Sequence, residues 1–170
     1  MTTNTTTETL KKPAHTSTRR WKGRSICQHT TRPALNALKS SAQDVKPWIL
    51  SIDDDEDFSG ALKLRLQTQG YDVVRAFAVD TGYQFAFDFE PAAILLDLNL
   101  PTGSGEELLS QLRYHPETAH IPILVVTGMN EPGLERRILA AGAYAFFRKP
   151  ISHTSLLEAL QKANNDGSSV

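Results

Sequence analysis

The stretch AILLDLNLP at residues 93–101 places a carboxylate directly after a run of aliphatic side chains. Residues 93–96 are apolar at successive positions, which is typical of a strand covered on both faces within a parallel sheet. An unpaired carboxylate is costly to bury, so Asp97 is expected where this strand reaches the surface. Binding sites of open α/β sheets lie at the carboxyl ends of their strands. The stretch therefore predicts a sheet and a functional site at its edge.

Four other short apolar runs are similar to residues 93–96, and helical patterns separate them. The runs are WILSI (48–52), YDVVRA (71–76), IPILVV (121–126) and AYAFF (143–147). Apolar residues three or four positions apart predict helices in the other segments, near 58–69, 80–89, 104–115, 134–141 and 152–162. Strands that alternate with helices form parallel sheets with right-handed crossovers. The predicted fold class is therefore α/β, with five strand–helix units in a doubly wound, three-layer sandwich.

The chain divides into a basic and an acidic part, although its net formal charge is only −1. Residues 1–47 contain nine Lys or Arg and two Asp or Glu, a formal charge of +7. Residues 48–170 contain nine and seventeen, a formal charge of −8. The first part is also poor in aliphatic residues, so it cannot bury enough apolar surface to offset the entropy of ordering. We predict a disordered basic extension over 1–46, a folded domain over 47–164 and a short polar tail over 165–170.

The basic extension is compatible with contacts to nucleic acid, to an anionic membrane or to an acidic protein. Its Arg- and Ser-rich, acid-poor start also resembles an organelle transit peptide. A solvated extension with none of these roles is the default interpretation. Cys27 is the single cysteine, and no apolar run approaches the roughly 20 residues of a membrane span. A cytoplasmic protein without a membrane span is therefore expected.

Polar residues follow four of the five predicted strands at the point where each strand ends. The first strand ends in the acidic run 53–56, the third in Asp97, the fourth in Thr127 and the fifth in Lys149. Because parallel strands end at the same edge of a sheet, these side chains should converge there. The sequence therefore predicts a cluster of carboxylates with one hydroxyl and one ammonium group.

Carboxylates this close together repel one another. At about 4 Å and an effective dielectric constant near 20, each like-charged pair costs on the order of 4 kcal/mol. Either one carboxylate binds a proton or a cation lies among them. Oxygen ligands without nearby His or Cys favour Mg²⁺. A carboxylate beside such an ion, with a Lys and a hydroxyl close by, is suited to accept a phosphoryl group.

The segment 48–163 resembles the receiver domain of two-component response regulators. The resemblance lies in four motifs in the family's order and spacing: ILSIDDDED (49–57), ILLDLNLPTGSG (94–105), ILVVTG (123–128) and AAGAYAFFRKPI (140–151). It implies the flavodoxin-like, CheY-like form of the doubly wound sandwich, with a parallel sheet of five strands.

The resemblance also implies a role for each acidic residue of the cluster. Asp97 matches the phosphoacceptor of the family. Asp54, Asp97 and the backbone carbonyl of Asn99 would ligate Mg²⁺ directly, and Asp53 would hold it mainly through water.

Four residues on the last two strands match further functional positions of the family. Thr127 and Lys149 would bind oxygens of the phosphoryl group after transfer. Pro150 would follow a cis peptide bond that aims Lys149 inward. Phe146 falls at the switch aromatic, which turns inward as Thr127 moves.

As a function, the resemblance implies a single-domain response regulator. The phosphoryl group would come from a sensor histidine kinase or a histidine phosphotransfer protein. The output would be altered binding of a downstream protein on the face of the fourth helix, fifth strand and last helix. No direct DNA binding is expected. The protein would not be an enzyme beyond catalysing its own phosphorylation and dephosphorylation.

Two other functions compete with this one. The first is a receiver-like binding module that works without phosphorylation, which the complete acidic set, Thr127 and Lys149 argue against. The second is a phosphatase of the haloacid dehalogenase type, which also uses an aspartate at a strand end. That family requires a second Asp two residues after the first, and here Asn99 occupies the position.

Overall fold

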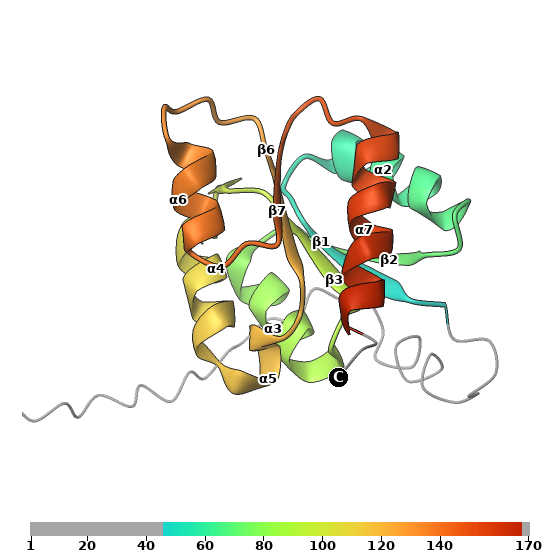
Figure 1. The fold of residues 1–170 in the computed structure, drawn as a ribbon, viewed down its shortest axis with the longest axis horizontal. Coiled ribbons are helices and arrows are strands. Elements are labelled where there is room, and N and C mark those ends of the chain that lie inside the picture. The colour runs from blue at the N-terminus through green and yellow to red at the C-terminus, as the bar shows by residue number, and fades with distance from the viewer. Residues whose placement is uncertain (1–45, 168–170) are drawn as a thin grey trace, which may run out of the picture.

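A computed structural model describes residues 46–167 of the chain. The extension predicted as disordered therefore lies outside the described residues, except for Lys46. The sheet has five parallel strands in the order β2-β1-β3-β6-β7. Their bounds are β1 Trp48–Ile52, β2 Asp72–Ala76, β3 Ala93–Leu96, β6 Ile123–Thr127 and β7 Ala145–Arg148. This order confirms the predicted doubly wound parallel sheet (Figure 1).

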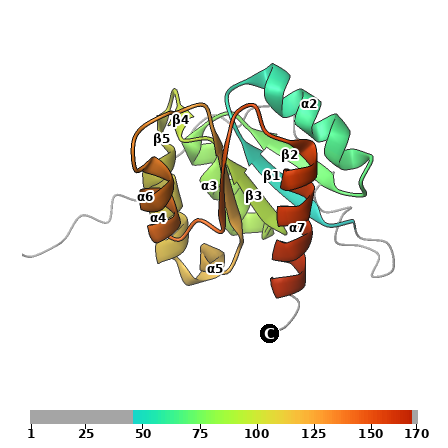
Figure 2. The same ribbon diagram turned by 45° about the horizontal axis from the view of Figure 1, so that its top comes forward.

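Helices cover both faces of the sheet. One side carries α2 (Glu56–Gln67) and α7 (His153–Gly167), which lie to the right of the sheet in Figure 2. The other side carries α3 (Val79–Phe89), α4 (Gly105–Tyr114), the short α5 (Pro116–Ala119) and α6 (Leu134–Ala140). None of the described helices is long and apolar enough to span a bilayer.

The strands supply both layers of the core because successive side chains point to opposite faces. Leu50, Leu96 and Val125 pack in the layer under α3, α4 and α6. Ile49 and Leu95, each one residue earlier, pack in the layer under α2 and α7. The central strands β3 and β6 are buried along their whole length, as their continuous apolar runs predict.

The helices begin where polar side chains or glycine permit. Asp55 accepts a hydrogen bond from the N–H of Phe58 at 2.9 Å and caps α2. Ser104 accepts one from the N–H of Glu107 at 3.4 Å and caps α4. Gly133, with a φ of 79°, precedes α6, which has seven residues.

Three details differ from the predicted elements. A short antiparallel hairpin of β4 (Asn99–Leu100) and β5 (Gly103–Ser104) follows β3, and α5 follows α4. Helix α7 continues to Gly167, past residue 164, where the folded domain was predicted to end. Its last turn is held by the Tyr144 hydroxyl, which donates to Asp166 Oδ2 at 2.7 Å.

Candidate functional site

The carboxyl ends of β1, β3, β6 and β7 meet at one end of the molecule. The backbone ladder continues one residue past each strand: the N–H of Asp53 donates to Ala76 O at 3.0 Å, and the N–H of Asp97 donates to Ile52 O at 2.9 Å. The N–H of Lys149 donates to Thr127 O at 2.9 Å. These bonds place the polar residues that follow the strands side by side.

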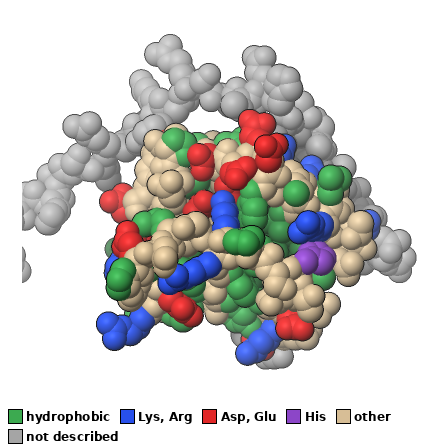
Figure 3. Space-filling view, turned by 90° about the horizontal axis from the view of Figure 1, so that it is seen from above, with side chains coloured by type: hydrophobic (Ala, Val, Ile, Leu, Met, Phe, Trp, Pro, Cys, Tyr) green, Lys and Arg blue, Asp and Glu red, His purple; other side chains and the backbone are tan. Residues whose placement is uncertain are grey.

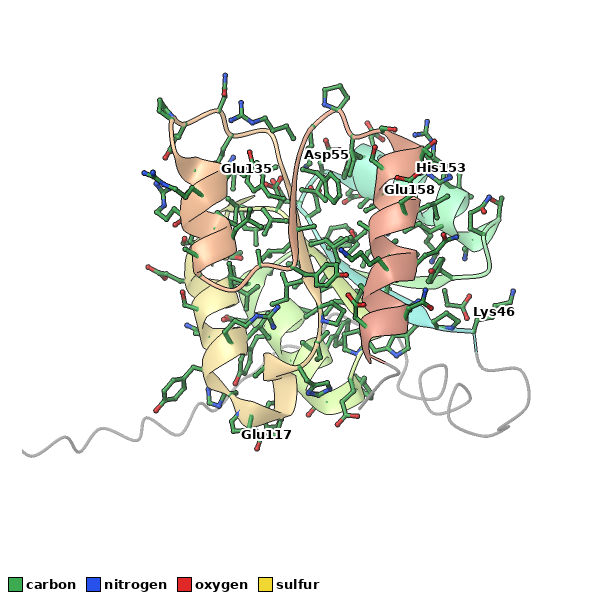
Figure 4. The ribbon with its side chains drawn as sticks, viewed as in Figure 1. Lys46, Asp55, Glu117, Glu135, His153 and Glu158 are labelled. Carbon is green, nitrogen blue, oxygen red and sulfur yellow. The ribbon has the colours of Figure 1, made fainter. Side chains whose placement is uncertain are left out.

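Acidic side chains gather at this end of the molecule around a basic one (Figure 3). Asp55, at the start of α2, lies at the same end, whereas Lys46 and Glu117 lie toward the opposite end (Figure 4). The described chain thus begins away from the site.

Lys149 bridges two buried carboxylates. Its Nζ lies 2.7 Å from Asp53 Oδ2 and 2.8 Å from Asp97 Oδ2. The remaining oxygens accept backbone hydrogen bonds, Asp53 Oδ1 from the N–H of Asp55 at 3.0 Å and Asp97 Oδ1 from the N–H of Asn99 at 3.2 Å. Asp53 is 3% exposed and Asp97 is 7% exposed. The repulsion between these acids is therefore offset by an ammonium group of the protein itself.

Burial and hydrogen bonding have opposite effects on the pKa values of Asp53 and Lys149. Burial raises the pKa of Asp53, and the hydrogen bonds from Lys149 and from the N–H of Asp55 only partly oppose this. Burial by itself lowers the pKa of Lys149, but its hydrogen bonds to Asp53 and Asp97 raise the pKa above its usual value on balance. Lys149 is therefore a cation at neutral pH.

Asp54 completes a set of three carboxylates. One oxygen each from Asp53, Asp54 and Asp97 lies within 4.8 Å of the other two. Oxygens around an octahedral Mg²⁺ lie about 3–4 Å apart, given ligand distances of about 2.1 Å. These hard donors could therefore hold such an ion after small side-chain movements. Asn99, whose carbonyl is the fourth predicted ligand, begins β4 two residues after Asp97.

Thr127 and Phe146 lie on the neighbouring strands β6 and β7. Thr127 is fully buried, and its Oγ1 accepts a hydrogen bond from the N–H of Met129 at 3.3 Å. Among the described residues, no hydrogen bond joins the Thr127 hydroxyl to the side chain of Asp97 or of Lys149. Phe146 is half-buried and packs against the core layer under α4 and α6. The peptide bond between Lys149 and Pro150 is cis, as predicted.

Phe58 also belongs to the site, and the sequence assigned it no chemical role. The Lys149 ammonium lies 4.3 Å from the centre of the Phe58 ring. The helical spacing of Phe58 and Leu62 placed that ring with the core. Its position in the first turn of the helix that follows the acidic run was the signal that could have connected it with the site.

Comparison with known proteins agrees with this geometry. Residues 49–161 match the response regulator receiver domain family. The chain belongs to this family, and the described domain is a receiver of two-component response regulators.

Two curated relatives differ in how much of their length the chain covers. The polar-differentiation response regulator DivK of Brucella ovis is 29% identical over 118 residues, 69% of this chain and 96% of DivK. The DNA-binding dual master transcriptional regulator RpaA of Synechocystis is 33% identical over 111 residues. That match covers 65% of this chain but only 46% of RpaA, so the chain spans about half of that relative.

Solved structures show the same fold. The crystal structure of a CheY-like response regulator receiver domain protein from Methanospirillum hungatei has a TM-score of 0.66 and 27% identity to this chain. The match covers 71% of this chain and 95% of that protein.

Proposed function

We propose that the protein accepts a phosphoryl group on Asp97 and signals through altered protein binding. The observation that carries the proposal is the contact of the Lys149 ammonium with Asp97, beside two further carboxylates at the ends of parallel strands. A buried nucleophile next to a fixed cation is what phosphoryl transfer requires, because catalysis of this reaction is mainly positioning and charge neutralisation.

In the proposed reaction an oxygen of the Asp97 carboxylate forms a bond to phosphorus. The bond from phosphorus to the leaving nitrogen of a phosphohistidine breaks, and its electron pair stays on the imidazole. Asp54, Asp97 and the Asn99 carbonyl would hold Mg²⁺ directly and Asp53 mainly through water, and the ion would supply positive charge beside the phosphoryl oxygens. Lys149 would exchange its contact with Asp97 for one with the transferred group, and the Thr127 hydroxyl would donate a hydrogen bond to another phosphoryl oxygen.

The proposed partners follow from this chemistry and from the fold. The donor would be a sensor histidine kinase or a histidine phosphotransfer protein in the cytoplasm. The output surface would be the face of α6, β7 and α7, because Thr127 ends the strand before α6 and Lys149 follows β7 in the loop that leads to α7. Phe146 on β7 would act as the switch aromatic. For the chain as a whole, we propose a receiver flanked by a basic extension and a short polar tail.

The function is tested with acetyl phosphate, which needs no partner protein. Incubation with acetyl phosphate and Mg²⁺ should produce an acid-labile phosphoprotein with one phosphoryl group, detected by mass spectrometry and phosphate-affinity electrophoresis. Asp97→Asn should abolish the product because the amide is not a nucleophile. Asp88→Asn, a change at an exposed acid on α3, is the matched control and should leave phosphorylation intact.

A wild-type protein that stays unmodified would favour the phosphorylation-independent binding module. Label that persists in Asp97→Asn would show that Asp97 is not the acceptor. Hydrolysis of simple phosphate esters is not expected.

A further inference from the structure

The ring of Phe58 forms a wall of the site beside Lys149. The ammonium lies over the ring at 4.3 Å from its centre, within the distance of a cation–π interaction. The Lys149 side chain is 18% exposed, so part of its hydration has been replaced by protein groups. The ring face is thus the third contact of the ammonium, after Asp53 and Asp97.

Two features hold Phe58 in place independently of the site. Its backbone N–H donates to the capping carboxylate of Asp55 at 2.9 Å, at the start of α2. Its half-buried side chain packs against the core layer under α2 and α7. The ring therefore keeps its position when the carboxylates change partners.

During phosphoryl transfer the Phe58 ring would keep its contact with Lys149, whereas the carboxylates would lose theirs. Asp53 and Asp97 are predicted metal ligands, and Asp97 is the predicted acceptor, so both would give up contacts with Lys149. The neutral Phe58 ring has no oxygen that could bind Mg²⁺ or phosphorus. It therefore keeps its attraction for the Lys149 ammonium during the whole reaction. A groove of about 470 Å³ opens beside Phe58, Lys149 and Pro150, so an ammonium without this contact could move toward water.

We propose that Phe58 is a positioning residue for phosphorylation of Asp97. Its ring face holds the Lys149 ammonium beside the acceptor while the carboxylate contacts are exchanged. This inference rests on the proposed function. In the test reaction a bond forms between Asp97 and the phosphorus of acetyl phosphate, the bond from phosphorus to the bridging oxygen breaks, and acetate leaves with the electron pair.

The first measurement is the initial rate of phosphorylation of the full chain by acetyl phosphate at saturating Mg²⁺. A small donor is used because a protein donor could also contact Phe58 directly. Phe58→Leu keeps an apolar side chain but removes the ring face, and it should lower the rate about fivefold. Phe58→Tyr should restore the rate to within about twofold, because Tyr also presents a ring face to cations.

The matched control is Phe77→Leu, which removes a second ring beneath a cation. Phe77 is 40% exposed, and the Arg75 guanidinium lies 5.2 Å from its ring centre, outside the carboxylate cluster. This change should leave the rate unaltered. If Phe77→Leu slows the reaction as much as Phe58→Leu, the inference is wrong.

The second measurement reports the contact without Mg²⁺ or phosphodonor. The ε-CH₂ protons of Lys149 should show an upfield NMR shift from the ring in the wild type and in Phe58→Tyr. The shift should disappear in Phe58→Leu. Pentafluorophenylalanine at position 58 keeps the shape of the ring but reverses its charge distribution, so it should slow the reaction in a folded protein even if Phe58→Leu does not fold.

The outcomes separate the two proposals. If the wild type is not phosphorylated, the proposed function fails. If the wild type is phosphorylated, the role of Phe58 is overturned by an unchanged rate with the fluorinated ring, or by failure of Phe58→Tyr to restore it. An unshifted Lys149 resonance in the wild type would overturn it as well.

Discussion

At the scale of single residues, Gly105 lies against the backbone that carries Asp97. A Cβ atom at position 105 would lie 2.3 Å from the carbonyl oxygen of Asp97 and 2.6 Å from the Cα of Leu98. Both distances are too short for non-bonded atoms, and neither neighbour is a flexible side-chain end. The N–H of Gly105 also donates to Leu98 O at 3.1 Å, which ties the start of α4 to the segment after β3. Glycine therefore allows α4 to approach the segment that carries Asp97.

Gly105→Ala should destabilise the domain and impair the site together. The clash is with backbone, so we expect a loss of about 1–3 kcal/mol in the free energy of unfolding, measured by urea denaturation. Phosphorylation by acetyl phosphate should slow in the same variant.

The control for this prediction is Gly60→Ala in α2. There the nearest atom to a new Cβ is Arg75 Nη1 at 3.5 Å, an ordinary contact. Alanine should raise the free energy of unfolding by about 0.5–1 kcal/mol, because glycine is unfavourable within a helix. A Gly105→Ala variant as stable as the wild type would show that the loop moves aside easily.

At the scale of elements, Arg113 ties the end of α4 to three other segments. Its Nε donates to Gly142 O at 2.7 Å, and its Nη1 donates to Ala119 O at 3.0 Å and Ile121 O at 2.8 Å. These carbonyls belong to α5, to the segment before β6 and to the turn between α6 and β7. Burial lowers the pKa of Arg113. The guanidinium therefore satisfies carbonyl groups that the ends of three elements would otherwise leave unpaired.

Arg113→Lys should destabilise the domain although it keeps the charge. An ammonium group cannot reproduce the planar fork that reaches carbonyls on separate segments, so we expect a loss of about 2 kcal/mol in urea denaturation. Arg136→Lys, on the exposed side of α6, is the matched control and should change stability by less than about 0.5 kcal/mol. Equal stability of the two variants would contradict this role of Arg113.

At the scale of the whole molecule, the proposed metal site should couple to folding. Its three carboxylates come from the ends of β1 and β3, and they converge only when the sheet is formed. A ligand that binds the folded chain alone stabilises it by mass action. In this domain the stabilisation by Mg²⁺ should extend to all helices and strands, because β1 and β3 are both interior strands of the sheet.

Mg²⁺ at one hundred times its dissociation constant should raise the free energy of unfolding by about 2.7 kcal/mol. Asp54→Asn should remove most of this gain, because it deletes one ligand and leaves the contacts of Lys149 with Asp53 and Asp97 in place. Asp57→Asn, an exposed acid outside the cluster, is the control and should keep the gain. If Mg²⁺ leaves the urea midpoint of wild-type unfolding unchanged, this result would argue against a metal site.

Local sequence patterns were enough to predict the five strands of the main sheet, their alternation with helices and the edge where the site lies. Continuous apolar runs predict buried parallel strands, and parallel strands bring their ends together. That is why the sequence predicts Asp53, Asp97 and Lys149 as neighbours. These inferences use local patterns, which indicate the helix or strand that contains each residue.

Which side-chain atoms meet depends on the tertiary packing. The bridge of Lys149 to both acids, the ring of Phe58 beneath it and the carbonyls around Arg113 join distant segments of the chain. The start of α3 depends on another such contact: the N–H of Val79 donates to the Thr102 hydroxyl oxygen at 3.0 Å. Such contacts depend on how elements pack and on which rotamers fit between them, and a local pattern does not contain that information.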